Sequence, residues 1–129
     1  MSIFTKIVKG EIPSYKIAED ESYYAFLDIF PNAKGHTLVI PKQEVDKIFD
    51  LDMETYNGLM QFSYRVAKAL EKTIRCERVG MSVVGLEVPH VHVHLIPING
   101  MSDMQFIKKE KLSSEEFEAI AKQVSANFV

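Results

Sequence analysis

The chain has 129 residues, 47% of them hydrophobic and 26% charged, which are the proportions of one ordinary globular domain over residues 1–129. With 15 basic and 18 acidic residues, the formal net charge is −3, so no basic surplus suggests a nucleic-acid polymer as partner. Residues 1–20 are rich in charge, Cys76 is the only cysteine, and no apolar run approaches the roughly 18 residues of a membrane helix, so we expect a cytoplasmic protein that spans no membrane.

Strand patterns come first along the chain. Tyr15 and Ile17 suggest a short strand, and clearer β-rich segments follow at Tyr23–Ile29 and His36–Pro41. The connection between those two segments, residues 31–35 (PNAKG), is rich in turn-forming residues. The pattern predicts a β-hairpin.

A long amphipathic helix is predicted over residues 53–74. Asp52 can cap its N-terminus, and Glu54 lies in its first turn. Two Val-rich strands are predicted after it, at residues 79–84 and 88–96, with Gly85 between them. The face of the helix that is expected to be buried comprises Tyr56, Leu59, Met60, Ser63, Val66, Ala67, Leu70 and Ile74.

A second helix is predicted near the C-terminal end. Ser113 and Glu116 have the spacing of a capping box, and Leu112 and Phe117 that of a hydrophobic staple. Strands in groups, with one helix between them and one after them, favour an α+β fold in which helices cover an antiparallel sheet. The stripe expected to be buried on this second helix comprises Phe117, Ile120, Ala121, Val124 and Phe128.

Three of the four histidines lie within five residues, at His90, His92 and His94. Side chains alternate between the two faces of a strand, so these imidazoles are predicted to line one surface while Val91 and Val93 enter the core. Successive members of the row would stand about 6.5 to 7 Å apart, close enough to contact one phosphate or share one ligand. This segment is the strongest functional signal in the sequence.

Three interpretations of the row compete. The histidines can be ordinary structural residues, as a lone His36 often would be. They can bind a metal with His36 as a further ligand, although by strand parity the carboxylate of Glu87 lies on the opposite face. Alternatively, one imidazole attacks phosphorus, since a side chain with a pKa of about 6.5 is largely neutral at pH 7. The clustering favours the third interpretation, with a phosphoryl or nucleotidyl group as the electrophile.

The sequence HVHVHLIP, residues 90–97, resembles the signature of the histidine triad (HIT) superfamily of nucleotide hydrolases and transferases. The segment Ala25–Lys42 resembles the nucleoside-binding hairpin of that family, and Ile3–Asp20 resembles its N-terminal segment. Together these blocks span residues 2–98 in the order in which the family has them.

The resemblance implies an α+β fold with a five-stranded antiparallel sheet and two main helices, paired as a homodimer, with a nucleoside monophosphate unit held in a surface cleft. It implies that His92 becomes nucleotidylated, that His94 contacts the α-phosphate and the leaving group, and that His90 orients the row. His36 is then a structural or supporting residue, and Asp28 binds the ribose hydroxyls. The residues implied to enclose the base are Ile3, Phe4, Ile7, Phe26 and Ile29.

The sequence departs from the family at a structural zinc site. Many bacterial members carry two cysteines near the start and a histidine after the hairpin, and these residues bind zinc. Here the corresponding positions hold Ser2, Thr5 and Glu44. We therefore expect neither this metal nor any other cofactor.

A second departure lies in the loop before the triad, residues 82–87 (SVVGLE), which is several residues shorter than the family pattern. Leu86 stands where the family has a polar Gln, and Glu87 adds a carboxylate, so donors to phosphate are lost and the substrate or the rate is altered. Ile98 also replaces an Arg that is common in the family. The substrate-binding candidates that remain in this loop are Ser82, Gly85 and Glu87.

Within the superfamily, the uridylyltransferase branch has Gln at the third triad position, so His94 indicates a hydrolase. The resemblance favours the phosphoramidase-like branch, acting at the α-phosphate of a purine nucleoside phosphoramidate or related conjugate. Two alternatives remain open: a nucleotide-binding sensor or partner module with little turnover, and a dinucleoside polyphosphate hydrolase.

Overall fold

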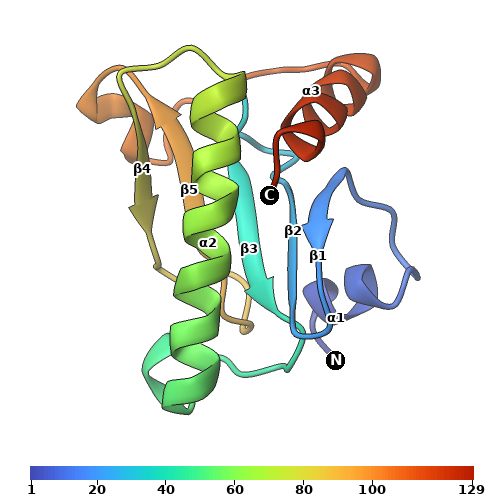
Figure 1. Ribbon diagram of the computed structural model, residues 1–129. Coiled ribbons are helices and arrows are strands. Elements are labelled where there is room, and N and C mark those ends of the chain that lie inside the picture. Colours follow the sequence, from blue (N-terminus) through green and yellow to red (C-terminus); the bar gives the residue numbers. More distant parts are fainter.

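The computed structural model describes residues 1–129 and is built around one five-stranded antiparallel sheet with the strand order β1-β2-β3-β5-β4 (Figure 1). Together with the helices, this sheet confirms the expected α+β fold. The strands are β1 (Lys16–Glu19), β2 (Tyr23–Leu27), β3 (Thr37–Pro41), β4 (Arg78–Ser82) and β5 (Val93–Ile98).

The two long helices lie where the sequence predicts them. Helix α2 (Met53–Thr73) begins after Asp52, whose side chain accepts a hydrogen bond from the Thr55 amide. Helix α3 (Ser114–Ala126) begins with the predicted capping box between Ser113 and Glu116. The chain also has a short helix at its start and two 3₁₀ turns, η1 (Ile48–Asp50) and η2 (Met101–Met104). None of the helices has the length and apolar character that crossing a membrane would require.

The short helix α1 (Ile3–Val8) was not predicted from the sequence. Six residues are too few for a helix to be stable by itself, so tertiary contacts must hold it. Phe4 and Ile7 supply these contacts, because both are buried against the sheet. The Ser2 hydroxyl caps the helix by accepting a hydrogen bond from the Thr5 amide.

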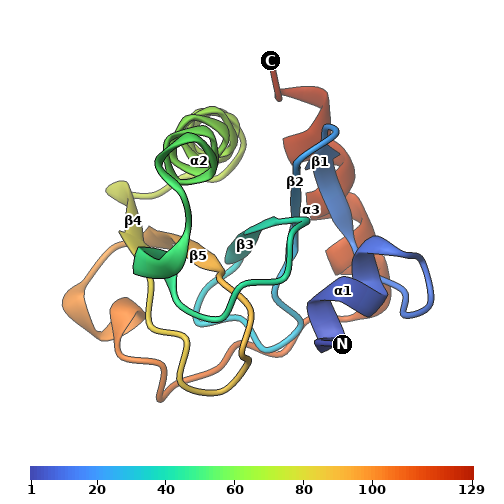
Figure 2. The ribbon, with the colours of Figure 1, turned by 90° about the horizontal axis from the view of Figure 1, so that it is seen from below.

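The two faces of the sheet are covered differently (Figure 2). Helices α2 and α3 pack on one face over the larger core, which includes Val91, Val93 and Leu95 as predicted. The opposite face carries a smaller cluster beneath α1, formed by Phe4, Ile7, Tyr24, Phe26, Leu38 and Ile40. His94 projects toward this second face, since it alternates with Val93 and Leu95 along β5.

The strand predicted over residues 88–96 is wrong in its first half, because β5 begins only at Val93. The amide of His90 donates to the carbonyl of Val88 in a tight turn, and the amide of Val91 donates to Val45 outside the sheet. Residues 88–92 are therefore irregular, and the parity that placed Glu87 on the Val91 face does not apply. The hairpin of β2 and β3 is confirmed, with Tyr23 opposite Pro41 and Leu27 opposite Thr37.

Candidate active site

Two cavities meet at His92 and His94. The first, which we call the apolar cavity, has a volume of about 310 Å³ and is lined mainly by hydrophobic side chains. It includes every residue that the resemblance assigned to the nucleoside: Ile3, Phe4, Ile7, Phe26, Asp28 and Ile29.

The second cavity, which we call the outer cavity, has a volume of about 480 Å³. Besides the two histidines and Asp28, it is lined by the loop of residues 84–87 and by Phe30, Phe106 and Lys109. The two cavities share Asp28, Phe30, Glu87, His92 and His94, so a ligand that fills both passes directly over the two imidazoles.

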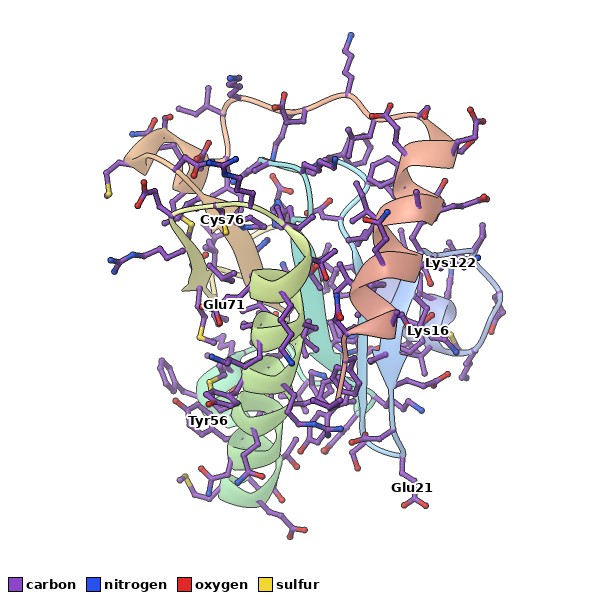
Figure 3. The ribbon with its side chains drawn as sticks, turned by 45° about the horizontal axis from the view of Figure 1, so that its top comes forward. Lys16, Glu21, Tyr56, Glu71, Cys76 and Lys122 are labelled. Carbon is purple, nitrogen blue, oxygen red and sulfur yellow. The ribbon has the colours of Figure 1, made fainter.

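The largest groove on the molecule lies elsewhere. It has a volume of about 870 Å³ and runs between β1 and α3, where Lys16 and Lys122 project from the two elements (Figure 3). No histidine or cysteine lines it, and its ionisable side chains are those of Tyr15, Lys16, Glu118 and Lys122. Volume is therefore a poor guide to the functional site here. The two smaller cavities are the better candidates, because histidines and a partly buried carboxyl group line them.

One hydrogen bond determines which ring nitrogen of His92 is left free. Its Nδ1 lies 2.8 Å from the backbone carbonyl oxygen of His90, which can only accept. The proton of the neutral ring is therefore on Nδ1, and Nε2 carries a free lone pair. The ring of Phe4 packs edge-on against His92 with 5.0 Å between centroids, which fixes the orientation of the imidazole. His92 is thus presented as a base or a nucleophile through Nε2.

His94 has the opposite tautomer, because a chain of hydrogen bonds passes through His36. The amide of Asn32 donates to Nδ1 of His36 at 2.9 Å, so the His36 proton is on Nε2. Nε2 of His36 donates in turn to Nδ1 of His94 at 2.9 Å. The remaining His94 proton is on Nε2, so His94 offers a hydrogen-bond donor beside the lone pair of His92. The ring centroids of His92 and His94 are 4.9 Å apart.

Burial keeps these supporting rings neutral. Loss of hydration lowers the pKa of His36 to about 3 and that of His94 to about 4, and the nearby imidazoles and Lys109 act in the same direction. Burial also lowers the pKa of His90. The neutral rings of His36 and His94 therefore keep the tautomers described above over the whole physiological range of pH.

These lowered pKa values predict a stability that falls in acid. In the unfolded chain both His36 and His94 bind a proton near pH 6.5, whereas the folded protein does not bind these protons until the pH is lower, so unfolding takes up protons. Between pH 6.5 and 5, the free energy of unfolding should fall by about 1.5 kcal/mol for each of the two histidines. Urea denaturation at a series of pH values measures this change. Stability that is constant or rises as the pH falls from 7 to 5 would contradict it.

Asp28 stands at the mouth shared by the two cavities. Burial raises the pKa of its carboxyl group, partly offset by the hydrogen bond that Oδ1 accepts from the Phe30 amide at 2.8 Å. Oδ2 lies 3.6 Å from Nε2 of His36, beyond the range of a good hydrogen bond. An acceptor in this position is suited to a pair of hydroxyl groups on a ligand.

One group of side chains has the spacing of a possible metal site. It consists of Asp28, His36 and His94, whose potential ligand atoms all lie within 4.8 Å of one another. The facing nitrogens of the two histidines are only 2.9 Å apart, and Nδ1 of His36 is occupied by the Asn32 amide. A shared proton accounts for this geometry, whereas two nitrogens bound to one zinc ion are about 3.3 Å apart. The arrangement fits a hydrogen-bonded chain better than a metal site.

His90 differs from the predicted row. It is fully buried and lines neither cavity, so only two of the three triad imidazoles face the site together. Its Nε2 donates to the carbonyl of Pro41 at 2.8 Å, and its Nδ1 lies 2.7 Å from the Ser2 hydroxyl. The row breaks because the chain turns at residues 88–90 instead of continuing as a strand. His90 thus contacts the site through its carbonyl group, which faces His92, and through the ring of Phe4 that packs against it.

Of the three substrate-binding candidates in the loop before the triad, two line a cavity and one does not. Gly85 and Glu87 line the outer cavity, and Gly85 has a φ of 77°, a conformation that favours glycine. Ser82 lines neither cavity: it pairs with His94 in the sheet, and its hydroxyl is buried without a hydrogen-bond partner. Its role as a substrate-binding residue remains a prediction.

The sequence did not reveal two residues from the segment after β5. Phe106, at a φ of 58°, packs its ring edge against His94 with 4.7 Å between centroids. Lys109 lies over that ring and donates to the side chain of Asn32 at 2.7 Å. Neither belongs to a recognisable motif, and only the folding of this segment back onto the site brings them there.

The comparison with known proteins agrees with this geometry. The model of the HIT domain family matches residues 9–101. The chain belongs to the HIT family. It is 45% identical over 96 residues to adenosine 5'-monophosphoramidase from Saccharomyces cerevisiae, a match that covers 74% of this chain and 61% of the yeast protein, less than two thirds of its length.

Solved structures of HIT proteins show the same fold. A HIT-like protein from Bartonella henselae superposes with a TM-score of 0.86 at 32% identity, covering 98% of this chain and 96% of that one. A zinc-bound histidine triad family protein from Mycobacterium smegmatis superposes with a TM-score of 0.81 at 27% identity, covering 97% and 91%. Family membership supports a nucleotide hydrolase of the HIT type.

Proposed function

We propose that the protein hydrolyses a purine nucleoside phosphoramidate, or a related conjugate, at the α-phosphate through a covalent bond to His92. The observation that carries this proposal is the hydrogen bond from Nδ1 of His92 to the His90 carbonyl, which leaves the Nε2 lone pair free where the two cavities meet. An imidazole in this state is a nucleophile that needs no deprotonation.

The reaction then has two displacements at phosphorus. The lone pair of His92 Nε2 forms a bond to phosphorus, and the bond to the leaving amine breaks with its electron pair on nitrogen, which takes a proton from solvent. Water next attacks phosphorus, the electron pair returns to Nε2, and the proton released from water passes to solvent. The Nε2–H group of His94 donates a hydrogen bond to the phosphoryl oxygens, whose negative charge grows in each transition state.

The two cavities suggest where each part of a substrate binds. The apolar cavity offers Phe4 and Phe26 to a base and the carboxyl group of Asp28 to the ribose hydroxyls. The outer cavity is left for the leaving group. The yeast relative, an adenosine 5'-monophosphoramidase, is consistent with this assignment.

The proposal is tested by incubating the protein with adenosine 5'-phosphoramidate and measuring the release of AMP. Release that depends on His92 supports hydrolysis. If AMP binds but the wild-type protein releases none from the phosphoramidate, the alternative of a nucleotide-binding module replaces the enzyme proposal.

One observation favours the dinucleoside polyphosphate alternative. Lys109 is the only cationic side chain that lines the outer cavity, and it is held there by Asn32 and by the face of Phe106. A polyphosphate leaving group carries negative charge into this cavity, whereas a simple amine does not. The carboxylate of Glu87 in the same cavity acts against such a charge.

Lys109 therefore gives a way to separate the two substrates. We expect Lys109→Met to lower kcat/KM for a dinucleoside polyphosphate about 10-fold, because one charge contact to phosphate is lost, and to change it less than about 2-fold for the phosphoramidate. Lys108→Met, at the neighbouring exposed lysine, is the control. Equal losses with both substrates would show that Lys109 does not distinguish leaving groups.

We also propose that the protein forms a homodimer through the edge of the sheet at β4. This strand has β5 as its single partner, and Met81 on it is half-exposed. On α2, Met53 and Tyr64 are exposed and Tyr56 lies on the surface (Figure 3). A second β4 could pair with this edge and cover these side chains. Light scattering at micromolar concentration should give the mass of a dimer, and the mass of a monomer would refute the proposal.

A further inference from the structure

Four side chains from distant parts of the chain converge behind His92. Ser2 and Thr5 come from the start of α1, Glu44 from the loop after β3, and His90 from the irregular segment before β5. We call Ser2, Thr5 and Glu44 the Glu44 cluster. They occupy the positions where, by the resemblance described above, many relatives bind zinc, and one of the superposed structures is zinc-bound.

The Glu44 cluster does not fit zinc. Structural zinc is held by thiolates, imidazoles and carboxylates, whereas two of the cluster's three side chains are neutral hydroxyl groups. The distances disagree as well. The Ser2 hydroxyl is 2.7 Å from Nδ1 of His90, and the Thr5 hydroxyl is 2.6 Å from Oε1 of Glu44. These are hydrogen-bond distances, whereas ligand atoms that surround one zinc ion are about 3.3 Å apart.

The direction of each hydrogen bond follows from its partners. Nε2 of His90 donates to the Pro41 carbonyl, so its Nδ1 accepts the proton of the Ser2 hydroxyl. The oxygen of Ser2 accepts in turn from the Thr5 amide. Both the Ser2 amide, at 2.6 Å, and the Thr5 hydroxyl donate to Oε1 of Glu44. Every donor in the cluster is satisfied, and the carboxylate of Glu44 is its only ionised group.

The cluster is connected to the nucleophile by two routes. His90, which Ser2 holds by its ring, presents its carbonyl to Nδ1 of His92. Ser2 also caps α1, which carries Phe4, and the ring of Phe4 packs edge-on against both His90 and His92. A displacement of Ser2 would therefore shift two groups that contact His92: the His90 carbonyl and the Phe4 ring.

We propose that Glu44 is a positioning residue: through Ser2 and Thr5 it anchors the ring of His90, and so keeps the proton of His92 on Nδ1 and its Nε2 free to react. This proposal rests on the proposed function of His92 as the nucleophile. It gives Ser2, Thr5 and Glu44 a shared role in orienting His92.

The tautomer of His92 gives a test that does not depend on turnover. Long-range ¹H–¹⁵N spectra of the imidazoles distinguish a ring protonated on Nδ1 from one protonated on Nε2. In the wild-type protein at pH 8, we expect His92 to be protonated on Nδ1. In Glu44→Ala, which leaves the Ser2 amide and the Thr5 hydroxyl without their acceptor, a large fraction of His92 should shift to the Nε2–H form.

Kinetics on the phosphoramidate provide the second readout. Glu44→Ala should lower kcat about 10- to 100-fold with KM within about 2-fold, because a misplaced nucleophile slows the chemical step without weakening nucleoside binding. Glu44→Gln keeps an oxygen acceptor and should recover kcat to within about 3-fold of the wild-type value. Asp46→Asn removes an exposed carboxylate from the same loop and is the matched control.

Thr5→Val serves as a second variant if Glu44→Ala does not fold, since it removes one donor to Glu44 with little change in shape. The proposal is overturned if His92 keeps the Nδ1 proton in these variants while kcat stays within 2-fold, or if one equivalent of zinc binds to the wild-type protein and is lost in Glu44→Ala. If the wild-type protein hydrolyses nothing, the proposed function fails, and the spectra still decide whether Glu44 controls the tautomer of His92.

Discussion

Replacing His92 with asparagine should abolish hydrolysis, lowering kcat for adenosine 5'-phosphoramidate by a factor of about 10⁴ or more. The amide nitrogen of Asn can take the place of Nδ1 and donate to the His90 carbonyl, so the hydrogen bond that orients this position is kept. What the variant lacks is Nε2, the atom that is proposed to attack phosphorus. AMP should still bind, because the apolar cavity is unchanged.

The control for this variant is its affinity for AMP, measured by isothermal titration calorimetry beside its rate. If His92→Asn binds AMP within about 3-fold of the wild-type protein and releases no product, the loss belongs to the chemical step. A variant that retains more than a hundredth of the wild-type rate would show that water attacks phosphorus directly and that His92 is not the nucleophile.

Substitutions of His94 should separate a hydrogen bond from a proton transfer. The lowered pKa of His94, about 4, and the hydrogen bond that it accepts from His36 make it a neutral donor through Nε2. His94→Leu removes that donor and should lower kcat by about 10² to 10³, the usual cost of losing one donor to a developing charge. His94→Gln places an amide N–H near the position of Nε2 and should stay within about 10-fold of the wild-type rate.

The alternative for His94 is transfer of its proton to the leaving group. Glutamine cannot act as an acid at any accessible pH, so His94→Gln would then be as slow as His94→Leu. The pattern should also depend on the leaving group, since an acid is needed most when the departing atom is strongly basic. Parallel assays with an amine and with a phenol ester as leaving group measure this dependence.

The sequence predicted the regular elements well because their signals are local. Asp52 and the pair of Ser113 and Glu116 mark the starts of α2 and α3 through contacts made within one helical turn. Helix α1 has no comparable pattern, and it exists because Phe4 and Ile7 find a hydrophobic partner on a distant sheet. Its formation is a tertiary effect that local propensity does not encode.

The same distinction explains what was missed at the site. Alternation along a strand correctly separated His94 from Val93 and Leu95, but it failed for His90, because the turn at residues 88–90 depends on hydrogen bonds to other segments. The positions of Phe106 and Lys109 also depend on long-range folding. The sequence pointed to the imidazoles that are proposed to act in the reaction, whereas their tautomers depend on hydrogen-bond partners such as Asn32.

The stereochemistry at phosphorus tests the covalent role of His92 most directly. A substrate whose α-phosphorus is made chiral with sulfur and an oxygen isotope is hydrolysed by the wild-type protein, and the configuration of the product is determined by ³¹P NMR. Two in-line displacements, one by Nε2 of His92 and one by water, predict retention of configuration. Inversion would mean a single displacement by water and would contradict the covalent pathway.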